Sequence, residues 1–277
     1  MYIVGFDAKG AMWNPIALRP EQTVIDARNT MLRYNISRVV IAKNRGPIGM
    51  ITEKDIARFL YRQVPSRQLD EIRLDEVMTR HLVTVCEETD LRVCAKLMLD
   101  KQISSLMVVD SKKKLKGIFT KTDLTNAYVE HFAMEHKVQE FMTRKTITVA
   151  QEEPIHSAIM LMSSNEISRI VVVKNKYPVG IVTGRDLLTL GGFFQGGDHR
   201  KVKNEQPFIP AGIKAAILVS DVMTRNPITT TPDSDLADAA YIMLRNRISG
   251  LPVVNSRQAL TGIVTKTDVV SALASHG

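Results

Sequence analysis

The chain has 277 residues, 44% of them hydrophobic and 24% charged, which is enough to bury one large core or two ordinary ones. No apolar run approaches the roughly 20 residues that cross a bilayer, and the first ten residues lack a signal-peptide pattern, so we expect a cytoplasmic protein with no membrane contact. A net charge of +8 attracts anions of every kind and therefore excludes little.

The reactive side chains do not form the patterns of an enzyme. Cys86 and Cys94 are the only cysteines, and the six histidines are scattered without metal-ligand spacing, so we expect free thiols and no metal. No phosphate loop of the GxxxxGK[ST] type and no nucleophile paired with a base is present. We therefore expect no catalytic residues.

One succession of elements occurs four times along the chain, and we call the copies repeats one to four. Each copy begins with a short leading strand, as in Leu82–Val85, Thr146–Val149 and Pro227–Thr230. Repeat one begins near Trp13–Leu18 and lacks the Met-Thr-Arg sequence that precedes the other three leading strands. That sequence stands at Met78–Arg80, Met142–Arg144 and Met223–Arg225.

An amphipathic helix and a buried strand are predicted next in every repeat. Apolar residues recur at helical spacing, for example Val24, Ala27 and Met31 in repeat one. Continuous Val/Ile runs then predict a strand that is buried on both faces. These runs are residues 36–43, 103–110, 167–174 and 248–255.

A seven-residue motif closes the second strand of each repeat and opens a second helix. It consists of a glycine, two apolar residues, a threonine, two variable residues and an aspartate, which we write GhhTxxD. The four copies are Gly49–Asp55, Gly117–Asp123, Gly180–Asp186 and Gly262–Asp268. Each repeat is therefore predicted to be a β-α-β-β-α unit, and the fold class is α/β (α+β).

The repeats fall into two kinds, which suggests that a two-repeat unit was duplicated. Repeats one and three carry Ser-Arg at the start of the central strand, whereas repeats two and four lack that arginine and carry Lys-Thr before the aspartate. We therefore expect two modules, repeats one with two and three with four. The expected boundaries are 1–76, 77–140, 141–192 and 221–277 for the repeats, with a connecting segment at 193–220.

The segment 191–212 does not repeat, and its glycines, prolines and charges predict a loop. A plain connection is one interpretation. Docking of a partner or covering of a ligand is the other, because Phe193 and Phe194 are costly to leave in water.

Two interpretations of the T-x-x-D part of the motif remain open. A threonine at a helix N-cap with an acid three residues later forms a capping box and needs no ligand. A short carboxylate at a helix start can also accept hydrogen bonds from the two hydroxyls of a ribose, while the helix N-terminus and nearby basic residues receive phosphate. The two roles are compatible.

With the β-α-β-β-α unit, the Met-Thr start, strands such as Ile248–Val254 and the GhhTxxD motif, the chain resembles the CBS-domain family. Four repeats in succession are similar to the γ regulatory subunit of AMP-activated protein kinase and to archaeal four-CBS proteins. The resemblance implies that two repeats pack by their sheets into a pseudo-twofold (Bateman) module with two clefts for adenosine nucleotides.

The resemblance also assigns roles to residues. The expected ribose-binding pairs are Thr52/Asp55, Thr120/Asp123, Thr183/Asp186 and Thr265/Asp268. Adenine is expected beside the leading strands, around Ile16, Val83, Ile147 and Ile228. Phosphate is expected at Arg38 and Arg169, with Lys54, Arg185, Ser37 and Ser168 as further candidates.

The expected function is therefore a regulatory sensor of AMP, ADP or ATP, without catalysis and without a metal, that acts on a protein partner or within a homodimer. The alternative is a basic CBS protein that binds nucleic acid or S-adenosylmethionine. Specific nucleic-acid binding is not favoured, because 5% aromatic residues and the absence of a recognised nucleic-acid motif do not support it.

Overall fold

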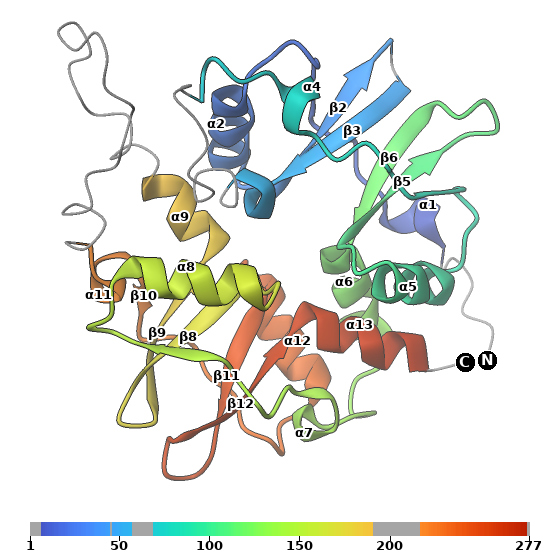
Figure 1. The fold of residues 1–277 in the computed structure, drawn as a ribbon. Helices are drawn as coiled ribbons and strands as arrows, with labels where there is room; N and C mark the ends of the chain where they lie inside the picture. The colour runs from blue at the N-terminus through green and yellow to red at the C-terminus, as the bar shows by residue number, and fades with distance from the viewer. Residues whose placement is uncertain (1–6, 45, 57–68, 191–216, 276–277) are drawn as a thin grey trace, which may run out of the picture. The chain divides into compact units, whose positions relative to one another are not determined.

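The computed structural model describes residues 7–44, 46–56, 69–190 and 217–275 (Figure 1). The segment 191–212 with Phe193 and Phe194, and nearly all of the expected connecting segment 193–220, lie outside the described residues.

All four repeats contain the predicted helix followed by an antiparallel strand pair (Figure 1). In repeat one, α2 (Val24–Tyr34) leads to β2 (Arg38–Lys43) and β3 (Gly46–Thr52). In repeat two, α5 (Leu91–Asp100) leads to β5 (Ser105–Val109) and β6 (Leu115–Thr120). In repeat three, α8 (Ile155–Ser164) leads to β8 (Arg169–Lys174) and β9 (Tyr177–Thr183). In repeat four, α12 (Leu236–Arg245) leads to β11 (Gly250–Val254) and β12 (Leu260–Thr265).

The leading strands are short and lie parallel to the central strand of their own repeat. β1 (Ala17–Leu18) pairs with β2, β4 (Thr84–Val85) with β5 and β7 (Thr148–Ala150) with β8. In repeat four the pairing is reduced to a single parallel bridge between Thr230 and Val253. Each repeat thus has the predicted succession of elements, and its strands pair in a small mixed arrangement.

The second helix of a repeat begins at the residue after the motif threonine. It is described as α6 (Lys121–His131), α9 (Gly184–Leu190) and α13 (Lys266–Ser275) in repeats two, three and four. In repeat one, only its first turn, up to Ile56, lies within the described residues.

The chain folds into two compact units, and these do not follow the order of the repeats. One unit joins residues 1–15, 81–146 and 228–277, and so holds repeats two and four. The other joins residues 16–80 and 147–227, and so holds repeats one and three. The sequence predicts modules of repeats one with two and three with four. The compact units group the repeats differently.

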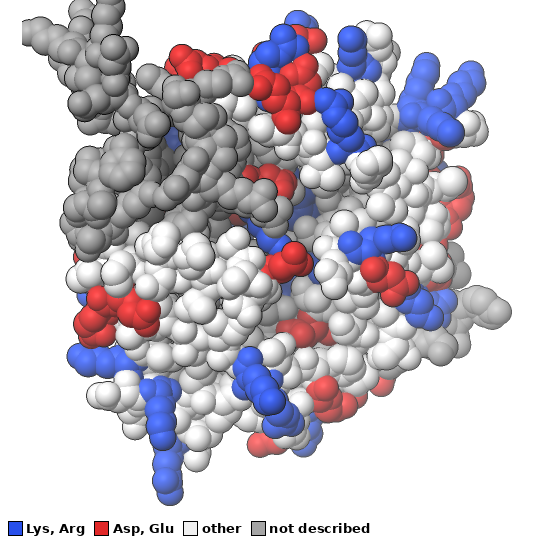
Figure 2. Space-filling model, viewed as in Figure 1, with Lys and Arg blue, Asp and Glu red and all other residues white. Residues whose placement is uncertain are grey.

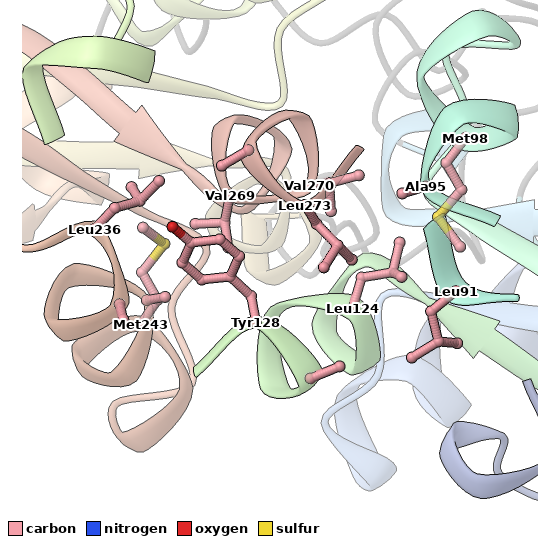
Figure 3. Close-up of a cluster of buried hydrophobic side chains, with 14 of the residues drawn as sticks. Leu91, Ala95, Met98, Leu124, Tyr128, Leu236, Met243, Val269, Val270 and Leu273 are labelled. Atoms are coloured by element: carbon pink, nitrogen blue, oxygen red, sulfur yellow. The ribbon is translucent and has the colours of Figure 1, made fainter. Parts of the chain in front are cut away.

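Helix packing explains the first of these units. Helices α5, α6, α12 and α13 enclose one continuous apolar core, to which both repeats contribute. Figure 3 shows Tyr128 of α6 beside Met243 and Val269, with Leu273 nearby on α13. Full burial of such a side chain contributes about 1.5–3 kcal/mol, so this shared core is a large stabilising term for the unit.

The second unit has two apolar clusters, one for each repeat. Val24, Met31 and Ile51 belong to the cluster of repeat one, and Ile159 belongs to that of repeat three. Leu188 of α9 lies in the cluster of repeat one although it belongs to repeat three. The helix after the motif therefore joins the two repeats of this unit.

The chain passes from one unit to the other four times. Shortly before each passage it forms a four-residue helix that is followed by a methionine. The helices are α1 (Ala8–Ala11), α4 (Leu74–Val77), α7 (Val138–Phe141) and α11 (Val219–Val222). In each, the amide of the following methionine donates to the carbonyl of the first helical residue. Met12 thus occupies the position of the methionines in the Met-Thr-Arg sequences, and the sequence analysis missed this first copy.

These methionines explain the invariant glycine of the motif. An added Cβ on Gly117 would lie 2.8 Å from Sδ of Met12, and one on Gly262 would lie 3.1 Å from Sδ of Met142. Gly49 and Gly180 are covered in the same way by Met78 and Met223. The glycine leaves room for a methionine against the second strand of the sheet.

Candidate functional site

The motif threonine and aspartate form the same hydrogen-bonded pair in all four repeats. The backbone amide and the hydroxyl of the threonine both donate to Oδ2 of the aspartate, over 2.9 and 2.7 Å for Thr52 and Asp55. The distances are 2.7 and 2.7 Å in repeats two and three, and 2.6 and 2.8 Å in repeat four. Each pair is half-buried, at the point where a strand ends and a helix begins.

This geometry is that of a helix cap, and it affects how a ligand can use the carboxylate. Oδ2 already accepts two hydrogen bonds, so a ribose would have to use Oδ1, which has two acceptor positions of its own. Within the described residues, no hydrogen bond reaches Oδ1 of Asp55 or Asp186. The capping role is therefore present, and it leaves one oxygen of these two carboxylates for a ligand.

The candidate arginines lie directly across the strand pair from the motif threonines. Arg38 is opposite Thr52 in the register of β2 and β3, and Arg169 is opposite Thr183 in that of β8 and β9. In repeats two and four the corresponding residues are Ser105 and Gly250. The difference between the two kinds of repeat therefore lies immediately beside the threonine–aspartate pair.

The candidate serines precede these arginines. The backbone carbonyl of Ser37 accepts from the amide of Glu53, and that of Ser168 accepts from the amide of Gly184. The side-chain hydroxyl of Ser37 accepts from Nη2 of Arg38 over 3.2 Å. The serines thus tie the start of the central strand to the start of the second helix.

Lys54 and Arg185 contact the other repeat of their unit. Nζ of Lys54 donates to the carbonyl of Glu166 over 2.9 Å. Nη2 of Arg185 lies 2.7 Å from Oε1 of Glu53, and Nε donates to the same oxygen. Their expected role as phosphate ligands stays a prediction, and the structure adds a second role as contacts between repeats.

The equivalent positions also join the repeats of the other unit. Nζ of Lys121 donates to the hydroxyl of Thr267, and Nζ of Lys266 donates to the hydroxyl of Thr122, both over 3.0 Å. The two variable residues of T-x-x-D are thus contacts between repeats in both units. The residues at these positions are the same in repeats two and four, Lys-Thr in both, but differ between repeats one and three, Glu-Lys and Gly-Arg.

The side chain of Glu53 is largely buried and has charged neighbours. Burial raises the pKa of Glu53 above its ordinary value, and the charges of Arg185 and Arg38 only partly oppose this. Asp186 also raises the pKa. The carboxyl groups of Glu53 and Asp186, and the guanidinium groups of Arg38 and Arg185, therefore share one electrostatic environment.

The expected adenine-binding residues lie one or two residues before the paired part of their leading strand. The carbonyl of Ile16 accepts from Val40, and that of Val83 accepts from Met107, so part of this backbone is used by the sheet. Ile147 is half-buried, and Ile228 is 42% exposed. An exposed isoleucine at this position offers apolar area for a base.

Sequence reasoning missed one residue, Trp13. Its indole Nε1 donates to Oδ1 of Asp123 over 2.9 Å, and its backbone pairs with Ile118 in β6. Trp13 follows Met12 as threonine follows methionine in Met78–Arg80. The spacing of this methionine before the leading strand was the signal that could have revealed it.

The described residues contain no group of three His, Cys, Asp or Glu side chains that could hold a metal ion. None of the described helices is long and apolar enough to span a membrane.

A family comparison accounts for all four repeats. The model of the CBS domain matches residues 8–62, 74–130, 138–191 and 219–275. The chain belongs to the CBS-domain family. The resemblance deduced from the motifs is thereby confirmed, as is the α/β fold of four CBS repeats.

Two proteins of known structure have the same fold over nearly the whole chain. Protein MJ1225 of Methanocaldococcus jannaschii is 26% identical over 274 residues, which cover 94% of this chain and 95% of that protein. Its crystal structure, described as that of a proposed archaeal homologue of g-AMPK, superposes with a TM-score of 0.80 at 23% identity and covers 95% of this chain and 97% of that one. A conserved protein from Pyrococcus horikoshii gives a TM-score of 0.65 at 23% identity, with 96% and 99% covered.

A shorter CBS protein has been solved with an adenine ligand. The match to the structure of CBSX2 in complex with AMP covers 50% of this chain and 97% of the CBSX2 chain, at 26% identity and a TM-score of 0.41.

Proposed function

We propose that this CBS protein is a non-catalytic sensor of adenine nucleotides such as AMP, ADP or ATP. The observation that carries the proposal is the placement of Arg38 and Arg169 directly opposite Thr52 and Thr183. The threonine that holds the ribose-binding carboxylate and the arginine for a phosphate are then paired residues of neighbouring strands. Arginine suits this role because its planar group binds phosphate oxygens in pairs.

Ligand occupancy would be passed on through the contacts between repeats. The variable residues of the motif, such as Arg185 and Glu53, join one repeat to the other within a unit. A phosphate at Arg38 would add negative charge near Glu53, whose pKa Arg38 already influences. Binding in one repeat would thus change the electrostatics of the other, and a partner protein would sense the altered unit.

Titration calorimetry tests the proposal. Asp186→Ala should weaken its site at least tenfold, because the ribose would lose two hydrogen bonds to a charged acceptor, each contributing about 1.5–3 kcal/mol. Asp238→Ala, at an exposed position of α12, is the matched control and should leave binding unchanged. Absence of heat from AMP, ADP and ATP would refute the proposal.

A second variant separates the phosphate from the ribose. Arg169→Met should strongly weaken the binding of AMP but hardly affect the binding of adenosine, since adenosine has no phosphate. Equal weakening of both ligands would instead indicate a structural role for Arg169.

Two alternative ligands are tested in the same way. Repeat four has Gly250 where repeats one and three have arginine, which would suit an adenosyl ligand without phosphate, such as S-adenosylmethionine. For nucleic acid the surface gives little support, because basic and acidic side chains are interspersed over the described part of the face in Figure 2.

A further inference from the structure

We propose that Trp13 closes the nucleotide site of repeat two, so that this site does not accept a ribose, whereas Asp55 and Asp186 keep Oδ1 for one. The inference rests on the proposed function and adds a residue that determines which motifs bind. The observation behind it is the hydrogen bond from the indole of Trp13 to Asp123.

The hydrogen bond occupies the oxygen that a ligand would need. Oδ2 of Asp123 accepts from the amide and the hydroxyl of Thr120, as in the other repeats. Oδ1 accepts from the indole over 2.9 Å. A ribose diol needs two acceptor positions, and the indole takes one of those on Oδ1 and places an aromatic ring beside it.

The backbone holds Trp13 firmly in place. Its amide and carbonyl both pair with Ile118, over 3.0 and 2.9 Å, in the strand that ends at Thr120. Met12, the preceding residue, lies against Gly117. The residue is 69% exposed, so burial does not fix the ring, and the hydrogen bond to Asp123 is a contact that orients it.

The other three motifs have a smaller residue at the equivalent position. Thr79 pairs with Met50, Thr143 with Ile263 and Thr224 with Ile181, in the register that Trp13 has with Ile118. A threonine side chain is too short to cover a carboxylate as an indole does. Only repeat two therefore has its aspartate covered from this position.

Fluorescence tests the contact without a nucleotide. Trp13 is the single tryptophan of the protein, so the emission reports on this site alone. Asp123→Asn should shift the emission, because the indole would lose its charged acceptor, whereas Asp55→Asn should not. An unchanged spectrum in Asp123→Asn would overturn the inference.

Calorimetry with AMP and with adenosine tests the consequence; adenosine is included because repeat two has Ser105 where repeats one and three have the arginine proposed to bind phosphate. In the wild-type background, Asp123→Ala should leave the number of sites and their affinities unchanged. Trp13→Thr should add one site, and Asp123→Ala in that background should remove it again. As a reciprocal variant, Thr79→Trp should remove one site from the wild type, while Thr79→Phe, which has no N–H, should weaken that site less.

The opposite results separate the two proposals. Two outcomes would overturn the closure by Trp13: the single variant Asp123→Ala loses a site, or Trp13→Thr binds more weakly than wild type. Both would still support nucleotide binding, because repeat two would then be a working site to which Trp13 contributes. Absence of heat from every variant would refute the proposed function and the closure with it.

Discussion

Nε of Arg185 in repeat three donates to Oε1 of Glu53 in repeat one over 2.8 Å, and both residues are variable positions of the T-x-x-D sequence. The side chain of Arg185 is 34% exposed and that of Glu53 is 16% exposed, so the ion pair is partly shielded from water. The contact links the two repeats of one unit at the point where their candidate ligand sites begin.

Removal of this ion pair should reveal coupling between the two repeats. In a double-mutant cycle with Glu53→Gln and Arg185→Met, we expect a coupling energy of about 1 kcal/mol, because the pair is only partly shielded from water. Denaturant unfolding measures it. The exposed pair Arg73–Asp75 is the control and should show no measurable coupling. A coupling of zero at Glu53 and Arg185 would contradict a structural link between the repeats.

The pH dependence of stability should carry a signature of Glu53. Burial raises the pKa of this carboxyl above its ordinary value of 4.5, so the folded state holds the proton more tightly than the unfolded state. The contribution of Glu53 to stability therefore falls as pH rises from 4.5 to the raised value, and is constant above it.

Melting temperatures of wild type and Glu53→Gln measure this effect, since other carboxyl groups cancel in the difference. The difference should change only in that pH interval, and in the direction that disfavours wild type as pH rises. A change of the opposite sign would show that Arg185 and Arg38 outweigh the burial.

Substitution of the motif glycines should test the methionine contacts. Gly117→Ala should destabilise the protein by about 1–3 kcal/mol through overpacking, because the new Cβ would meet Met12 Sδ at 2.8 Å. Met12→Gly in the same chain should restore part of the loss, because Sδ, Cβ and Cγ of Met12 lie 2.8, 2.9 and 3.0 Å from the new Cβ and glycine removes all three. Denaturant unfolding measures it.

Gly262 provides a contrast. Its added Cβ would meet the backbone carbonyl of Thr143 at 2.9 Å, and that carbonyl accepts from the amide of Ile263. Met142→Gly should therefore rescue Gly262→Ala much less than Met12→Gly rescues Gly117→Ala, because the carbonyl of Thr143 stays in place. Equal rescue would show that the methionine alone fills the space.

The two cysteines should differ in reactivity. Burial raises the pKa of Cys94 to about 12, so little of it is the reactive thiolate at neutral pH. Cys86 is exposed. A thiol reagent should modify one cysteine of the native protein and the second only after unfolding. Cys86→Ser should abolish the fast reaction, whereas fast modification of Cys94 would contradict its place in the core of repeats two and four.

The sequence alone determined the local structure of this protein. The Val/Ile runs, the apolar helix faces and the four GhhTxxD motifs predict each repeat, because strand and helix periodicity and helix caps depend on neighbouring residues. The repeated Thr52/Asp55 pattern also located the candidate sites, and the family comparison confirmed the repeats.

Only the tertiary structure decided which repeats share a compact unit and which side chains complete each motif. The pairing of repeats two with four depends on helix faces such as those of α6 and α12, and similar apolar faces occur on every repeat. The bond from Trp13 to Asp123 joins residues 110 positions apart. No local pattern specifies such a contact, because it forms only when the strand that carries Ile118 places both residues side by side.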